Sequence, residues 1–353
     1  MAELLKNLYN EKYINLLSEG LFSDEFKKKI FDDEWKNKEL KQRMRHISIT
    51  MGRFLPKEYD KAIDLLKVRF SQIKPYYGLE NMIFQDFVEV YGIHNFEKSM
   101  EALEYFTKDC SSEFAIRRFI MKYPKKTMKQ MKIWAKSDDL HVRRLASEGC
   151  RPRLPWAIAL TEFKENPKKI IEILEMLKDD ESEYVRRSVA NNLNDISKDN
   201  PDLVKNLANN WLGKNENRDK LLKHGCRTLL KASDKYILNL FGFKKIEDLK
   251  VDDFKITKKV KNGNDLSFSF FIESEKNLGK LRIEYALYFL RQNNKYIKKV
   301  FKISEGIYKQ NSKKVQKIYS FKPISTRRYY TGLHKVEIIV NGESLHVDDF
   351  YYL

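Results

Sequence analysis

A basic motif repeats within the first two thirds of the chain. Val142–Arg144 recurs as Val185–Arg187, 43 residues later, and an Asp-Asp pair precedes each copy, at Asp138–Asp139 and Asp179–Asp180. Repeats of about 40 residues built from helix pairs are typical of HEAT-like solenoids, in which each repeat buries its apolar face against the next. Apolar residues also recur at helical spacing up to about residue 240. The sequence therefore predicts an α-helical HEAT-like-repeat solenoid over residues 1–240.

A fainter third copy extends this register. Glu148–Arg151 aligns with His224–Arg227, which makes two sets of positions equivalent: Arg144, Arg187 and Lys220, and beside them Glu148, Asn191 and His224. Stacked repeats place equivalent positions side by side on one concave surface. We therefore expect a ladder of basic residues flanked by polar ones, suited to following a phosphate backbone. The Asp-Asp pairs fall in the turns before the basic helices, where N-capping is the simplest explanation.

The pattern changes near residue 240. Beyond it, runs such as Leu266–Ile272 and Lys335–Val340 alternate apolar with polar residues, and turn signals such as Asn262–Asp265 separate them. About seven candidate strands follow residue 252. They predict a small immunoglobulin-like β-sandwich over residues 241–353, without a disulfide because the region lacks a cysteine pair. The expected fold class is therefore mainly α, with an all-β second domain.

The charge of the chain favours a polyanionic partner. The formal net charge is +18 and the pI is near 9.4, which suits DNA, RNA or an anionic membrane. The alternative is a lysine-rich composition that serves only as solvated surface. From residue 241 onward, 23 lysines and arginines stand against 13 aspartates and glutamates, and Arg291–Arg328 holds twelve basic residues with one acid. We expect the β domain to clamp nucleic acid through its phosphates.

Several classes of protein are disfavoured. Cys110, Cys150 and Cys226 lie far apart without a CxxC pair, and the six histidines form no metal-ligand pair, so we expect no disulfide, no metal and no cofactor. No apolar run approaches the ~18 residues of a membrane span, and the N-terminus lacks the apolar core of a signal peptide. We therefore expect a soluble, cytoplasmic protein with no membrane contact.

Two glutamates are candidates for chemistry. Glu113 follows two serines that resemble a helix start, which places it in a first turn, where compensation of the helix dipole is the alternative role. Glu148 lies four residues after Arg144, on the same helix face. An ordinary ion pair is the alternative there, but the equivalent positions in the next repeats, Asn191 and His224, are also polar.

A proline-rich turn follows Glu148. Trp156 follows Pro155, which suits the first turn of a new helix. Its side chain could pack between repeats or form an aromatic wall against a base or sugar. Arg151 and Arg153 flank Pro152 in the same stiff turn, where guanidiniums are well placed for phosphates, although a solvated loop is the alternative.

These segments resemble a known family. Ser112–Arg117, Val142–Gly149, Arg151–Trp156 and Tyr184–Lys198 are similar to the AlkC group of HEAT-like-repeat DNA glycosylases, the superfamily that also includes AlkD. The similarity covers most of residues 1–235, and the β-rich C-terminal part resembles the immunoglobulin-like domain carried by some members. Two departures are Arg118, where the family pattern predicts proline, and Cys150, where it predicts threonine; neither removes a carboxylate or a phosphate ligand.

The resemblance implies a monofunctional DNA glycosylase without lyase activity. Its substrates would be cationic alkylated bases in duplex DNA, chiefly N3-methyladenine with N3-methylcytosine second, and the base would not be flipped into a pocket. Glu113 would lead catalysis and Glu148 would assist, by stabilising an oxocarbenium-like sugar, with Trp156 as the aromatic wall. The residues expected to bind DNA are Arg117, Arg143, Arg144, Arg151, Arg153, Arg186, Arg187, Asn191 and Lys220. We expect a monomer.

Two other functions fit the same residues. A non-catalytic DNA or RNA clamp would use the arginine ladder with both glutamates in structural roles. A HEAT scaffold for protein partners would need an apolar concave groove, whereas the register predicts arginine, asparagine and histidine there. The salt dependence of binding separates the scaffold from the other two.

Overall fold

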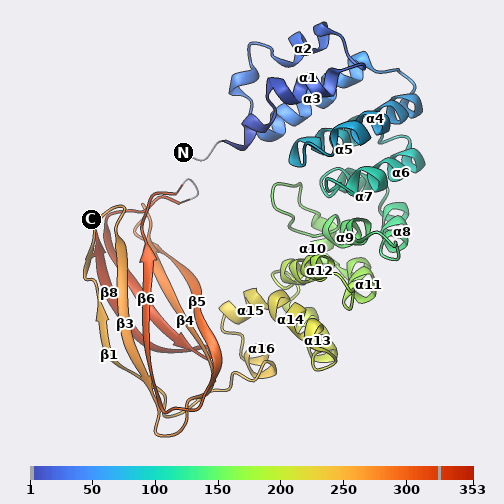
Figure 1. Ribbon diagram of the computed structural model, residues 1–353. Helices are drawn as coiled ribbons and strands as arrows, with labels where there is room; N and C mark the ends of the chain where they lie inside the picture. The colour runs from blue at the N-terminus through green and yellow to red at the C-terminus, as the bar shows by residue number, and fades with distance from the viewer. Residues whose placement is uncertain (1–3, 325–326) are drawn as a thin grey trace. The chain divides into compact units, whose positions relative to one another are not determined.

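The computed structural model describes residues 4–324 and 327–353 (Figure 1). Sixteen α-helices in these residues precede eight β-strands. The chain divides into two compact units: the first extends to Val204 and includes Trp211–Gly225, and the second comprises Lys205–Asn210 and Cys226–Leu353. The predicted fold class, a helical solenoid followed by an immunoglobulin-like sandwich, is confirmed.

The helices are between 5 and 15 residues long. Three 3₁₀ helices accompany them, at Leu5–Leu8, Trp35–Asn37 and Leu79–Asn81. The α-helices are α1 (Glu11–Ser18), α2 (Asp24–Ile30), α3 (Leu40–Phe54), α4 (Tyr59–Ile73), α5 (Met82–Tyr91), α6 (Phe96–Thr107), α7 (Ile116–Lys122), α8 (Pro124–Trp134), α9 (Leu140–Glu148), α10 (Thr161–Glu165), α11 (Lys168–Leu177), α12 (Glu183–Ile196), α13 (Pro201–Trp211), α14 (Glu216–Gly225), α15 (Arg227–Lys231) and α16 (Lys235–Leu240).

The helices of the first unit stack in two rows, as expected for a solenoid of helix pairs. Contacts link α3 to α5, α5 to α7, α9 to α12 and α12 to α14 in one row, and α4 to α6 and α8 to α11 in the other (Figure 1). The candidate chemistry lies in the first row, at α7 and α9. None of the helices in the described part of the chain has the length and apolarity needed to cross a membrane.

Helix α9 shows how the repeat sequence produces this stacking. Asp139 caps the helix by accepting hydrogen bonds from the backbone N–H groups of His141 at 2.8 Å and Val142 at 3.2 Å, as the Asp-Asp pattern predicts. Val142 and Leu145 are fully buried, since they lie on the face that packs against the neighbouring helices. Burying an aliphatic side chain of this size contributes roughly 1.5–3 kcal/mol.

A glycine allows the end of α9 to approach α7. A Cβ added to Gly149 would lie 2.7 Å from Cγ2 of Ile116, closer than carbon atoms pack. Any side chain at this position would push the first residue of α7 away from the end of α9. Glu113 and Glu148 flank this contact, so the glycine keeps the two carboxylates within reach of one arginine.

The second unit contains a two-sheet sandwich. One sheet has the order β1-β3-β6 and the other the order β2-β8-β7-β4-β5. The eight strands exceed the predicted number of about seven because the two-residue β2, which pairs in parallel with β8, is too short to produce an alternating pattern. The strands are β1 (Lys250–Ile256), β2 (Lys259–Val260), β3 (Asp265–Glu273), β4 (Gly279–Leu290), β5 (Tyr296–Tyr308), β6 (Ser312–Ser320), β7 (Gly332–Val340) and β8 (Glu343–Tyr352).

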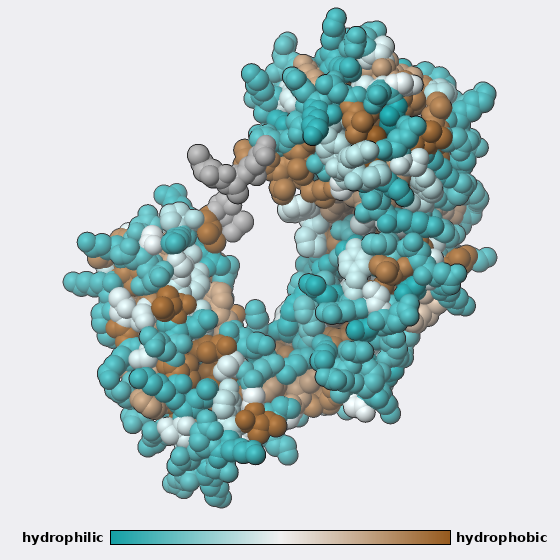
Figure 2. All heavy atoms as spheres, viewed as in Figure 1, coloured by the Kyte–Doolittle hydropathy of each residue, from teal (hydrophilic) through white to brown (hydrophobic). Residues whose placement is uncertain are grey.

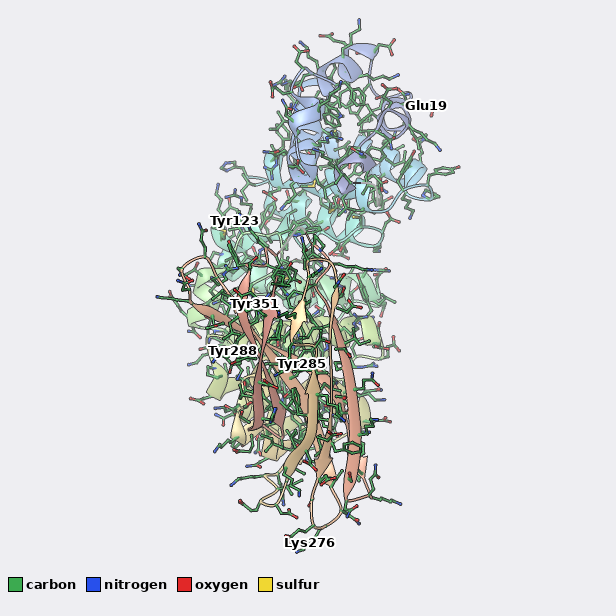
Figure 3. The ribbon with its side chains drawn as sticks, turned by 90° about the vertical axis from the view of Figure 1, so that its left-hand side faces the viewer. Glu19, Tyr123, Lys276, Tyr285, Tyr288 and Tyr351 are labelled. Carbon is green, nitrogen blue, oxygen red and sulfur yellow. The ribbon has the colours of Figure 1, made fainter. Side chains whose placement is uncertain are left out.

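Aromatic residues fill the space between the sheets. Phe268 on β3 and Tyr285 on β4 meet edge to face, with ring centroids 5.2 Å apart. Phe321 is fully buried in the same core, where its ring lies 5.0 Å from that of Tyr352 on β8. Tyr288, labelled with Tyr285 in Figure 3, lies on the opposite face of β4, and its hydroxyl donates to Glu337 at 2.7 Å. Alternation along the strand therefore separates the core from the polar face.

Candidate catalytic cleft

Two carboxylates come together where α7 and α9 meet. Glu113 lies in the turn that precedes α7, and Glu148 is the last residue of α9. The expectation that Glu113 stands in the first turn of a helix is wrong, because α7 begins at Ile116. The two serines before Glu113 bond elsewhere: Ser112 is buried and donates to the carbonyl of Leu103, and Ser111 donates to Glu113 itself.

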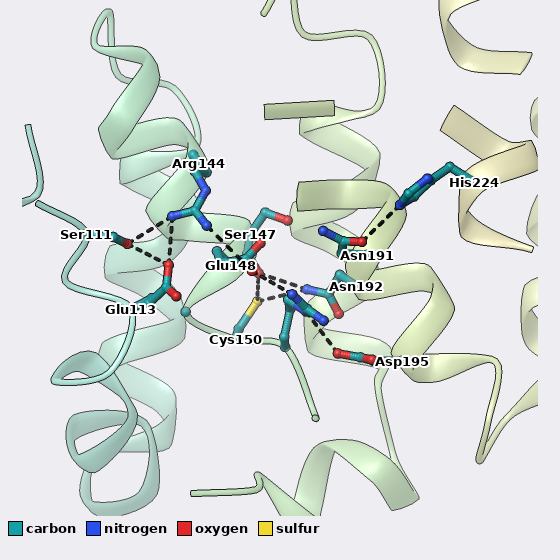
Figure 4. A network of polar contacts seen from close by, with 12 residues as sticks. Ser111, Glu113, Arg144, Ser147, Glu148, Cys150, Asn191, Asn192, Asp195 and His224 are labelled. Carbon is teal, nitrogen blue, oxygen red and sulfur yellow. Dashed lines mark hydrogen bonds and ion pairs between the residues drawn. The ribbon is translucent and has the colours of Figure 1, made fainter. Parts of the chain in front are cut away.

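Arg144 joins the two glutamates. Its Nη1 donates to Oε2 of Glu113 at 2.7 Å and to Oγ of Ser111 at 3.0 Å, and its Nη2 lies 3.6 Å from Oε1 of Glu148 (Figure 4). The guanidinium also stacks over the ring of Tyr184 at 4.8 Å. Burial alone would lower the pKa of Arg144, but Glu113 and Glu148 outweigh it and raise that pKa. The arginine therefore stays charged and fixes both carboxylates.

Glu148 is held from its other side by Arg151. Nη1 of Arg151 donates to Oε1 of Glu148 at 2.6 Å, and its Nε donates to Asp195 at 2.9 Å. The side chain of Glu148 is only 5% exposed, yet Oε2 is buried without a hydrogen-bond partner among the described residues. A buried carboxylate oxygen that lacks a donor is costly. Both cations contact Oε1, so the unpaired oxygen of Glu148 is Oε2.

The carboxylates line a cleft of about 340 Å³, within the size range of small-ligand sites. Its walls are largely apolar, so they provide a low-dielectric surrounding in which charges interact strongly. The residues that line it are Leu79, Met82, Cys110, Ser111, Glu113, Phe114, Glu148, Arg151, Leu154, Pro155 and Trp156.

Trp156 stands at the mouth of this cleft. It is 66% exposed and adopts a φ of 62°, so the expectation of a first helical turn is wrong: the next helix, α10, begins at Thr161. Pro155 and Trp156 occupy the centre of a turn closed by a hydrogen bond from the N–H of Ala157 to the carbonyl of Leu154 at 3.3 Å. A positive φ at the third turn position is usually given to glycine. Because tryptophan stands at this position, no local sequence pattern predicts its positive φ.

Besides Arg144 and Arg151, three of the residues expected to bind DNA are engaged with other parts of the helical unit. Arg117 is 1% exposed and donates to the carbonyls of Ile158, Arg151 and Gly149 at 2.7, 2.8 and 3.1 Å. Burial lowers the pKa of Arg117 to about 10. Arg143 donates to Asp180 and to two turn carbonyls, and Arg186 donates to the carbonyls of Asp180 and Glu181.

Other members of that set lie closer to solvent. Arg187 is exposed, and no partner is recorded for it in the described part of the chain. Lys220 is 69% exposed and pairs with Glu216 at 2.7 Å. Arg153, with 38% of its side chain exposed, pairs with Asp199. Oδ1 of Asn191 accepts a hydrogen bond from Nε2 of His224 at 3.0 Å, so two positions that the repeat register makes equivalent lie side by side (Figure 4).

The structure adds residues that the sequence analysis missed. Asp195 anchors Arg151, Tyr184 supports Arg144, and Lys41 donates to the carbonyl of Trp156 at 2.8 Å. The family resemblance could have indicated Asp195 and Tyr184, because both lie in the matching segment Tyr184–Lys198. Lys41 lies 115 residues before its partner, and no local pattern points to it.

Cys110, which lines the cleft, and Cys150, two residues after Glu148, are buried free thiols. No group of three or more histidines, cysteines, aspartates or glutamates that could hold a metal ion occurs in residues 4–324 and 327–353. Burial raises the pKa of Cys110 and of Cys150 to about 12, so neither is a thiolate at neutral pH. The charged groups that line the cleft are the carboxylates of Glu113 and Glu148 and the guanidinium of Arg151.

Comparison with known proteins places the chain in a family. A family model described as "DNA alkylation repair enzyme" matches residues 93–224, and one described as "Uncharacterised protein YhaZ, C-terminal Ig-like domain" matches residues 250–352. Uncharacterized protein YhaZ of Bacillus subtilis (strain 168) is 42% identical over an alignment of 352 positions, and the match covers 97% of each chain. The structure of Pseudomonas fluorescens alkylpurine DNA glycosylase AlkC, bound to DNA containing an abasic site analog, matches with a TM-score of 0.94 and 32% identity, covering 99% of this chain and 100% of that one. The chain belongs to the AlkC-type DNA alkylation repair enzymes.

The predicted resemblance to the AlkC group is thereby confirmed. The segment that matches the DNA alkylation repair model contains Glu113, Arg144, Glu148 and Trp156, and all the residues that line the cleft except Leu79 and Met82. The immunoglobulin-like match begins at the first residue of β1 and ends at Tyr352 on β8. The family assignment therefore covers both the helical unit with the cleft and the sandwich.

Proposed function

We propose that this AlkC-type protein is a monofunctional DNA glycosylase that hydrolyses the N-glycosidic bond of cationic alkylated bases in duplex DNA. The observation that carries the proposal is the pair of glutamates: each has one oxygen held by an arginine, and both line a small apolar cleft beside an exposed tryptophan. The solved AlkC, whose description names it an alkylpurine DNA glycosylase bound to DNA, supports the same activity.

The charge of the cleft suits such a reaction. Of the charged side chains that line the cleft, Glu113 and Glu148 are acidic and Arg151 is basic. The lining thus carries a net negative charge between apolar walls, which favours a cation. As the C1′–N bond breaks, the base keeps the bonding electrons and becomes neutral, and positive charge develops on the sugar. Preorganised carboxylates stabilise this charge without rearrangement.

Water completes the hydrolysis. Its oxygen bonds to C1′, and one of its protons passes to a carboxylate and then to solvent. Oε2 of Glu148 suits this role because it is buried and lacks a donor; Glu113, at 16% exposure, lies on the other side of Arg144. The indole of Trp156 provides an aromatic wall against the developing cation. An alkylated base that already carries a positive charge leaves without protonation, so no separate acid is needed.

The arginines divide into two roles in this proposal. Arg144 and Arg151 hold the carboxylates, and Arg117 holds the loop that carries Trp156. Arg143 joins its repeat to the next one, and Arg186 bonds to the turn that precedes its own helix. The DNA backbone would be contacted by the more accessible polar side chains, which are Arg153, Arg187, Asn191 and Lys220. Phosphate contacts of this kind add affinity that falls steeply with salt.

We further propose that residues 241–353 form a domain that grips the duplex. Strands β5 and β6 carry a basic surface with aromatic neighbours: Lys313 lies 4.6 Å from the ring centroid of Tyr308, and Lys314 lies 5.8 Å from that of Phe271. Both strands are edge strands of their sheets. Lysines on an edge also prevent unwanted strand pairing. The protein would bind DNA as a monomer.

Mass spectrometry of bases released from methylated duplex DNA, with EDTA present, tests the proposal. We expect N3-methyladenine first and N3-methylcytosine more slowly, with no strand nicking, since no lysine forms a covalent intermediate in this scheme. An isosteric control, Glu216→Gln, removes an exposed glutamate that pairs with Lys220 and should release the same bases. Tight, salt-sensitive binding without release of any base would instead identify a non-catalytic clamp.

A further inference from the structure

Trp156 is held in an unusual conformation with little packing of its own. Its φ of 62° lies in the left-handed region, and its side chain is 66% exposed. A bulky residue pays an energetic cost there and keeps that conformation only where its surroundings enforce it. Since the indole has little packing around it, the enforcement must come through the backbone of the loop.

One residue contacts that backbone at Trp156 itself. Lys41, the second residue of α3, donates a hydrogen bond from Nζ to the carbonyl of Trp156 at 2.8 Å. The same ammonium lies 4.4 Å from the ring centroid of Phe114, the residue next to Glu113. Phe114 and Trp156 both line the cleft. A single cation from α3 therefore touches both walls of the site.

The surroundings of Lys41 support a fixed position rather than a solvated one. The side chain is half-buried, and this burial lowers the pKa of Lys41. No carboxylate pairs with its ammonium in the described part of the chain, where its partners are the carbonyl of Trp156 and the ring of Phe114. Hydrogen bonds from a charged donor are stronger than neutral ones.

Arg117 secures the remainder of the same loop. It donates to the carbonyls of Gly149, Arg151 and Ile158, on either side of Trp156. Within the described residues Arg117 makes no hydrogen bond to Trp156, whose carbonyl is bound by Lys41. Lys41 on α3 and Arg117 on α7 thus bind four backbone carbonyls of the loop between α9 and α10.

We propose that Lys41 is a positioning residue, which locks the turn around Trp156 so that the indole stands against the sugar at Glu113 and Glu148. The proposal rests on the glycosylase function argued above. Lys41 acts through Trp156 and contacts neither the base nor the sugar. Its loss should let the turn relax toward a common backbone conformation and move the indole. Displacement of a positioned group by about 1 Å can cost roughly 100-fold in rate.

Tryptophan fluorescence tests the position of the indole without any substrate. The chain has four tryptophans, and the other three are at most 8% exposed, so acrylamide quenching reports mainly on Trp156. We expect Lys41→Met to change the quenching of the Trp156 signal, defined by subtraction of Trp156→Phe, and Lys41→Arg to restore most of it. Lys61→Met, which removes an exposed lysine on α4, is the matched control. Unchanged quenching in Lys41→Met would overturn the proposal even if the enzyme is active.

Kinetics then separate positioning from other roles. At saturating methylated duplex, Lys41→Met should slow single-turnover release of N3-methyladenine roughly 10- to 100-fold, with affinity for the duplex unchanged within about two-fold. In a Trp156→Ala background, Lys41→Met should have no further effect, because the two residues act as a unit. Additive losses with weakened binding would show a phosphate contact instead. If wild type releases no base, the proposed function fails, while the fluorescence result still decides the role of Lys41.

Discussion

Arg143 offers a sharp test of which arginines hold the fold and which face DNA. Its Nε and Nη2 donate to the two oxygens of Asp180 at 2.6 and 3.1 Å, and its Nη1 donates to the carbonyls of Ser137 and Asp138 at 3.0 and 2.9 Å. The side chains of Arg143 and Asp180 are 11% and 5% exposed. This contact joins one repeat to the next, so we predict that Arg143→Met destabilises the helical unit.

The magnitude follows from what the substitution leaves behind. Asp180 would stay buried with one bond, from the N–H of Ser182 at 2.9 Å. Removing one partner of a buried ion pair costs about 3–5 kcal/mol. We expect about 3 kcal/mol because Ser182 still compensates part of the charge. For a unit of this size, 1 kcal/mol corresponds to about 2–4 °C in Tm, so the unfolding transition should shift down by roughly 6–12 °C.

Thermal and urea unfolding followed by circular dichroism measure this loss, and DNA affinity over a range of salt concentrations measures phosphate contacts. Arg187→Met is the matched comparison, since Arg187 occupies the position after Arg186 in the next repeat and is exposed. Arg187→Met should change the free energy of unfolding by less than about 0.5 kcal/mol. It should also reduce the salt slope, which is the slope of log K for DNA binding against log salt concentration, by about one. A stable Arg143→Met protein with a reduced salt slope would refute this reasoning.

Three further predictions concern other parts of the molecule. Burial raises the pKa of Asp86 to about 6 although Arg45 lies 2.8 Å away. Because this folded pKa exceeds the unfolded value of about 3.9, the carboxyl stabilises the fold below about pH 4, and that stabilisation is lost as the pH rises to about 6. Asp86→Asn should therefore remove roughly 3 kcal/mol of the pH dependence of stability, measured by urea unfolding at pH 4 and pH 8. Gly149→Ala would place a Cβ 2.7 Å from Ile116 and should cost about 1–3 kcal/mol of stability and slow base release at saturating DNA; an unaltered rate would separate the α7–α9 contact from catalysis. Replacing Lys313–Lys314 with glutamines should lower the salt slope of DNA binding by about two and leave the single-turnover rate at saturation unchanged.

The sequence was sufficient where local patterns determine the structure. The repeat of Val-Arg-Arg predicted stacked helices, and the alternation beyond residue 240 predicted the sandwich. The four-residue spacing of Arg144 and Glu148 placed them 3.6 Å apart, as expected on a helix. Helical periodicity and strand alternation are set by the backbone, so these features need no knowledge of distant contacts.

Local sequence patterns do not predict the features that depend on contacts between distant segments of the chain. Adjacent residues on a helix point about 100° apart, so Arg143 and Arg144 serve different surfaces, and only the packing of the next repeat shows which faces inward. Trp156 takes its left-handed conformation from a tight turn that Lys41 and Arg117 hold from other helices. The pattern of proline before tryptophan is also compatible with a helix start.

Single-turnover release of N3-methyladenine from duplex DNA in the presence of EDTA tests the central claim most directly. The rate should be compared among wild type, Glu113→Gln, Glu148→Gln and the exposed control Glu216→Gln. Loss of one catalytic group typically costs 10²–10³-fold, so we predict that Glu113→Gln and Glu148→Gln each lose at least 100-fold while folding and DNA affinity are retained, and that Glu216→Gln matches wild type. Wild-type rates in both cleft variants would contradict the carboxylate mechanism.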